Sequence, residues 1–87
     1  MNKMDEKTLR LLADNGAIQR ISIIADGSCL RVEAVTQTGT HIATTLKGKM
    51  RTWSSLDSAA KFVHSLGVGA VYLDLHNWQP KQKAIPL

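Results

Sequence analysis

Hydrophobic and polar positions recur along this chain with two different periods, which predict helices at some places and strands at others. Residues 4–15 carry apolar side chains at helical i, i+3, i+4 spacing, at Leu9, Leu12 and Ala13. A second helix is predicted from residue 56, where Ser54 and Asp57 match a capping box and Ser55 is the other candidate cap. Gly67 follows as its expected C-terminal glycine.

Three stretches have the pattern of strands. Residues 17–25 are rich in β-branched side chains and are followed by Asp26-Gly27, a strong hairpin signal. Residues 28–36 alternate cleanly between apolar and polar positions, and residues 41–53 continue extended, with Gly48 as a bulge or a turn. A last strand is predicted over residues 70–78.

Together these elements predict one domain over residues 1–80, followed by a basic, mobile tail over residues 81–87. Strands joined by short turns pair antiparallel, and two amphipathic helices most simply cover one sheet face. We therefore predict an α+β fold with an antiparallel sheet of four to five strands and two helices on one face, in the order α-β-β-β(-β)-α-β. The core is thin for 87 residues, so we expect a homodimer.

Helices on one face leave the other face of the predicted sheet open. At period two, Lys47, Lys49 and Arg51 point the same way, and Trp53 shares their parity. Cations beside an aromatic ring are typical of a surface that holds phosphates and stacks a base. The predicted nucleic-acid-binding residues are Lys47, Lys49, Arg51, Trp53 and Arg31. The same face is expected to carry Glu33, His41, Thr45, Tyr72 and Asp74.

Each of these features also has a more common structural explanation. Lysines at a solvated strand edge discourage aggregation, and a bulge at Gly48 would break the shared parity. A tryptophan near the end of a strand or helix more often packs as a lid on the core, or in a dimer interface, than as a binding platform. That packing is our first interpretation of Trp53 and Trp78.

The chemistry of the chain points away from catalysis. His41, His64 and His76 lie in different elements without metal-ligand spacing, so we predict no metal site, no cofactor and no enzyme. The single cysteine, Cys29, excludes an intramolecular disulfide and is expected to be a small buried residue. The net charge of +4 permits nucleic-acid binding. No segment approaches the ~20 apolar residues of a membrane span, so we expect a cytoplasmic protein without a membrane partner.

Four segments carry a resemblance that covers about residues 8–80: LLADNGAIQRISI, GSCLRVEAV, RTWSSLDSAAKFVHSLGV and VYLDLHNWQP. Together they resemble small plasmid-encoded accessory proteins of the ParC-type partition-associated family. The resemblance implies a role in plasmid maintenance, beside an ATPase and a centromere-binding protein, and it supplies no catalytic residue. A second stretch, GTHIATTLKGKMRTWSSLDSAAKFV, resembles the arm-binding domains of phage integrases, which place a three-stranded sheet in the DNA major groove.

These observations predict a non-enzymatic accessory protein of plasmid maintenance or partition that acts as a small adaptor. DNA and plasmid partition proteins are its expected partners, and the basic strand is its expected DNA contact. The alternative is a protein-interaction module, such as an inhibitor or immunity-like partner, with no nucleic-acid role.

Overall fold

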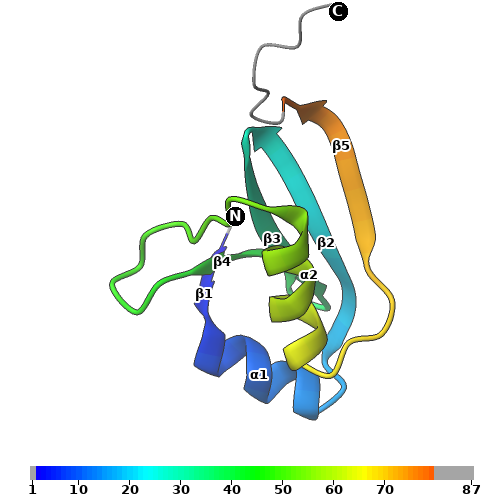
Figure 1. Ribbon diagram of the computed structural model, residues 1–87. Coiled ribbons are helices and arrows are strands. Elements are labelled where there is room, and N and C mark those ends of the chain that lie inside the picture. The colour runs from blue at the N-terminus through cyan, green and yellow to red at the C-terminus, as the bar shows by residue number, and fades with distance from the viewer. Residues whose placement is uncertain (1, 80–87) are drawn as a thin grey trace, which may run out of the picture.

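The computed structural model describes residues 2–79, which form five strands and two helices (Figure 1). Their order is β1 (Asn2–Asp5), α1 (Glu6–Asp14), β2 (Ile18–Gly27), β3 (Cys29–Thr36), β4 (Gly39–Thr44), α2 (Leu56–Ser65) and β5 (Tyr72–Trp78). The predicted α+β class is confirmed. The predicted tail over residues 81–87 lies outside the described residues.

The strands form one sheet in the order β1-β4-β3-β2-β5. Strands β2, β3 and β4 are an antiparallel meander, whereas β1 pairs parallel with β4 and β5 pairs parallel with β2. The prediction of a wholly antiparallel sheet is therefore wrong at both edges. The reason is that both helices are crossover connections. Helix α1 connects β1 to β2, and α2 connects β4 to β5. A helical crossover lets the strands on either side of it run in the same direction.

The two helices begin at polar caps that the sequence located only in part. Asp5 caps α1 by accepting a hydrogen bond from the backbone N–H of Thr8 at 2.9 Å, and this bond lowers the pKa of the Asp5 carboxyl. Ser55 caps α2 by accepting from the backbone N–H of Ser58 at 3.1 Å. The alternative cap is thus the correct one, and the predicted box of Ser54 with Asp57 is wrong.

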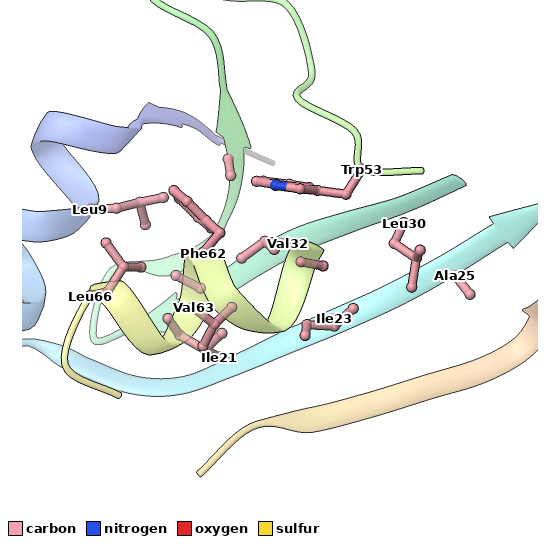
Figure 2. Close-up of a cluster of buried hydrophobic side chains, with 13 residues drawn as sticks. Leu9, Ile21, Ile23, Ala25, Leu30, Val32, Trp53, Phe62, Val63 and Leu66 are labelled. Carbon is pink, nitrogen blue, oxygen red and sulfur yellow. The ribbon is translucent and has the colours of Figure 1, made fainter. Parts of the chain in front are cut away.

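The hydrophobic core lies between the helices and one face of the sheet (Figure 2). Strands β2 and β3 contribute the sheet side of the core, where Ile23 pairs with Val32. Helix α2 packs Phe62 and Val63 against it. Trp53 is 8% exposed, and its ring centroid lies 4.8 Å from that of Phe62. The backbone of Trp53 also exchanges two hydrogen bonds with Leu30, at 2.9 and 2.8 Å. The interpretation of Trp53 as a core residue is confirmed.

Candidate nucleic-acid interface

Residues 44–51 fold into a tight turn, which we call the basic hairpin, that projects from the end of β4 (Figure 1). The N–H of Thr45 donates to the carbonyl of Lys49 at 2.8 Å, and the N–H of Gly48 donates to the carbonyl of Thr45 at 2.9 Å. Gly48 has a φ of 83°, which a residue with a side chain rarely adopts. The predicted extended run over residues 41–53 is therefore interrupted, and the turn at Gly48 is confirmed.

Side chains of two kinds are exposed on this hairpin. Lys47 and Lys49 stand in solvent, and neither has an acidic partner among residues 2–79. Leu46 is 87% exposed, more than any other large apolar residue in the described part of the chain, and Met50 is 51% exposed. The hairpin therefore presents two solvent-exposed positive charges beside an apolar side chain at its tip.

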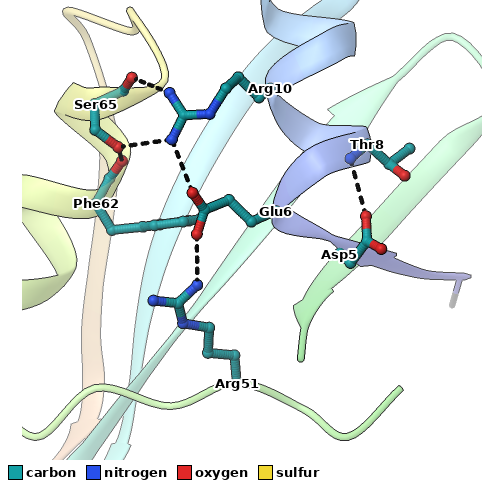
Figure 3. Close-up of polar contacts among 7 residues, drawn as sticks. All are labelled: Asp5, Glu6, Thr8, Arg10, Arg51, Phe62 and Ser65. Atoms are coloured by element: carbon teal, nitrogen blue, oxygen red, sulfur yellow. Dashed lines mark hydrogen bonds and ion pairs between the residues drawn. The ribbon is translucent and has the colours of Figure 1, made fainter. Parts of the chain in front are cut away.

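Arg51 has a different role, because its guanidinium turns back toward the helices (Figure 3). Its Nη1 donates to Glu6 Oε1 at 2.9 Å, and its guanidinium lies over the rings of Trp53 and Phe62, at 5.0 and 4.8 Å from their centroids. The other oxygen of Glu6 accepts from Arg10 at 2.9 Å. Arg51 thus fastens the base of the hairpin to α1 and covers the edge of the core.

Arg31 lies apart from the hairpin, on the sheet face opposite the helices. Its Nε donates to Glu33 at 2.9 Å, and its Nη1 lies 3.6 Å from Asp26, so its charge is matched locally. The expectation that all five predicted site residues share one strand face is therefore wrong. Only Lys47 and Lys49 stand together in solvent, because the chain turns at Gly48 and Arg51 finds a carboxylate on α1. Whether these residues contact nucleic acid stays a prediction.

Two cations that the sequence did not single out lie near the hairpin. Lys3 is on β1, which pairs with β4, and Lys7 lines a groove of about 720 Å³ together with Leu46. Neither has an acidic partner within residues 2–79. Lys3 gave no signal in the sequence because β1 is only four residues long and shows no clear alternation.

The charges of the described residues are unevenly distributed among the elements of the fold. Around β1, α1 and the hairpin, the basic residues are Lys3, Lys7, Arg10, Lys47, Lys49 and Arg51, and the acidic ones are Asp5, Glu6 and Asp14. Elsewhere the basic residues are Arg20, Arg31 and Lys61, and the acidic ones are Asp26, Glu33, Asp57 and Asp74. The excess positive charge of residues 2–79 therefore lies on β1, α1 and the basic hairpin.

The ion pairs of Glu6 predict a measurable dependence of stability on pH. Hydrogen bonds from Arg10 and then Arg51 lower the pKa of Glu6 from its ordinary value of 4.5. A lowered pKa in the folded state stabilises the protein above pH 4.5, and this contribution is lost as the pH falls through the lowered value. Glu6→Gln should therefore cost about 0.5–1 kcal/mol at pH 7, as expected for partly exposed pairs. Urea unfolding at pH 7 and pH 3 checks this, and a penalty that is unchanged at the lower pH would contradict it.

Two further expectations about single side chains are wrong, and a third is tested only in part. His41 is buried on the helix side of the sheet, 6% exposed, with its Nε2 2.9 Å from the hydroxyl of Thr36. Cys29 is exposed, because it follows directly on the β2–β3 turn. Trp78 is 38% exposed on edge strand β5 and does not belong to the core, and its place in a dimer interface stays a prediction.

Within residues 2–79, no three histidine, cysteine, aspartate or glutamate side chains gather closely enough to hold a metal ion. Neither α1 nor α2 has the length and apolar character needed to cross a membrane. The sequence matches no protein-family model, and no curated protein is significantly similar to it.

Proposed function

We propose that this chain is a small, non-enzymatic adaptor of plasmid maintenance that binds double-stranded DNA through the basic hairpin. The plasmid context is supported by the sequence resemblance alone. The observation that carries DNA binding is the pair Lys47 and Lys49, which have no acidic partner within residues 2–79 and stand on a projecting turn near Lys3 and Lys7. Unpaired cations are the groups that neutralise phosphates at the least cost, because they break no existing ion pair.

This proposal predicts how affinity depends on salt. If all four lysines contact phosphates, the logarithm of the association constant should fall with a slope of about −3.6 against the logarithm of salt concentration. Affinity for a mixed-sequence duplex should then drop by about 100-fold between about 50 and 200 mM salt. Fluorescence anisotropy of a labelled duplex measures this directly. Absence of binding at the lower salt concentration would overturn the proposal.

A protein-interaction module is the second candidate, and the edge strand β5 is the observation in its favour. Exposed apolar side chains gather at and next to this strand, at Val71, Tyr72, Leu73, Leu75 and Trp78. An added strand could extend the sheet here. However, the pairing of β5 with β2 shifts register after Asp74, and the Asp74 carboxylate already accepts from the N–H of His76 at 2.9 Å. Both features hinder strand addition, so we rank DNA binding first. A partner captured after nuclease treatment would favour this second candidate.

A further inference from the structure

We propose that Leu46 is a wedge that inserts between base pairs in the minor groove of the DNA held by the basic hairpin. This inference rests on the proposed DNA binding and adds to it a mode of contact. Leu46 is 87% exposed at the tip of the hairpin. A side chain with so little of its surface covered contributes little to the stability of the isolated chain, so its burial is available to a partner.

The hairpin fixes the backbone on both sides of this leucine. The bonds between Thr45 and Lys49 and between Gly48 and Thr45 close the turn on either side of the tip, and the N–H of Arg51 donates to the carbonyl of Ala43 at 3.0 Å. At the base, the Arg51 side chain is fixed by Glu6 and by the two aromatic rings. A wedge must keep its shape while it separates stacked bases, and these contacts give the tip that rigidity.

The charges beside Leu46 favour DNA as the partner. Lys47 follows directly and Lys49 lies two residues further, so both ammonium groups can reach phosphates on either side of a groove that the tip enters. The minor groove is about 6 Å wide and admits one side chain at the tip of a narrow turn. Proteins that bind there insert Leu, Ile, Met, Phe or Pro wedges between cationic contacts and bend the duplex by roughly 20–90°.

The test is a bending experiment on duplexes of about 20 base pairs that carry a fluorescence donor and acceptor at their two ends. The chain should raise energy transfer on a duplex with central TA or CA steps, which unstack easily, more than on an A-tract duplex. Leu46→Ala should abolish this bending and weaken binding about tenfold, whereas its salt dependence should remain because the lysines are intact. Leu46→Phe should restore the bending.

Each outcome separates this inference from the function on which it rests. Binding without bending, or bending by Leu46→Ala equal to that of the unaltered chain, would overturn the wedge and leave DNA binding in place. Binding to neither duplex would overturn both proposals. Binding of vesicles of anionic lipid that is lost in Leu46→Ala, with DNA affinity unchanged by that substitution, would assign the tip to a membrane surface instead. Circular dichroism of each variant checks that the fold is retained.

Discussion

Replacing Trp53 with alanine is expected to destabilise the fold by about 3–5 kcal/mol, the usual effect of truncating a large aromatic residue in a core. The indole is 8% exposed, packs against Phe62 and lies under the guanidinium of Arg51. Its loss opens a cavity between the sheet and α2, and it removes the ring contact with Phe62 and the cation–π contact with Arg51. Urea unfolding followed by circular dichroism measures the effect.

Trp78→Ala is the matched control, because it removes the same side chain from the exposed edge strand. Trp78 is 38% exposed and does not belong to the core cluster, so its truncation should cost about 1 kcal/mol or less in the monomer. Trp53→Phe should fall between the two. Equal losses of stability in Trp53→Ala and Trp78→Ala would contradict the assignment of one tryptophan to the core and the other to the surface.

The double substitution Lys47→Gln with Lys49→Gln is expected to have the largest effect on DNA binding. Each lysine that contacts a phosphate contributes about 0.9 to the salt slope, so the slope should become shallower by about 1.8. Affinity at about 50 mM salt should fall at least tenfold. Stability should not change by more than about 0.5 kcal/mol, since both side chains are exposed and form no ion pair within residues 2–79. Anisotropy titrations at several salt concentrations give both quantities.

A control with the same loss of charge is available away from the hairpin. Arg20→Gln with Lys61→Gln also removes two positive charges, one beside Tyr72 and one on α2, where Lys61 pairs with Asp57. This variant should change the affinity for the DNA duplex only slightly, because it lowers the net positive charge of the protein without altering the hairpin. An equal weakening by both double variants would mean that the chain attracts DNA by overall charge, without a site at the hairpin.

The sequence predicted the two helices, the three meander strands and β5, because each has a clear period or a strong turn signal. It missed β1, since four residues with mixed character show no period, and strand pairing over a distance of nearly forty residues leaves no local pattern. For the same reason, the parallel pairing of β1 with β4 and of β5 with β2 could not be predicted. Which strand an edge strand pairs with depends on where the preceding or following helix places it against the sheet. That placement is a property of the whole fold.

The candidate site was predicted in part. Lys47 and Lys49 were found by their charge, but Arg51 was grouped with them because a two-residue period was extended through Gly48. The sequence already contained the competing turn signal in that glycine. It gave no local sign that Arg51 pairs with Glu6, whose carboxylate lies 45 residues away along the chain and accepts a hydrogen bond from Arg51 at 2.9 Å. Long-range ion pairs of this kind decide which cations remain free for a ligand.

The most direct test of DNA binding at the basic hairpin is a nuclear magnetic resonance titration of the isotope-labelled chain with an unlabelled duplex. We predict that backbone amide signals shift for residues 44–51 and for Lys3 and Lys7, while those of β5 stay in place. The Lys47→Gln with Lys49→Gln variant should lose these shifts at the same DNA concentration. Shifts confined to β5 or to the sheet face around Arg31, with the signals of the hairpin unmoved, would contradict the account.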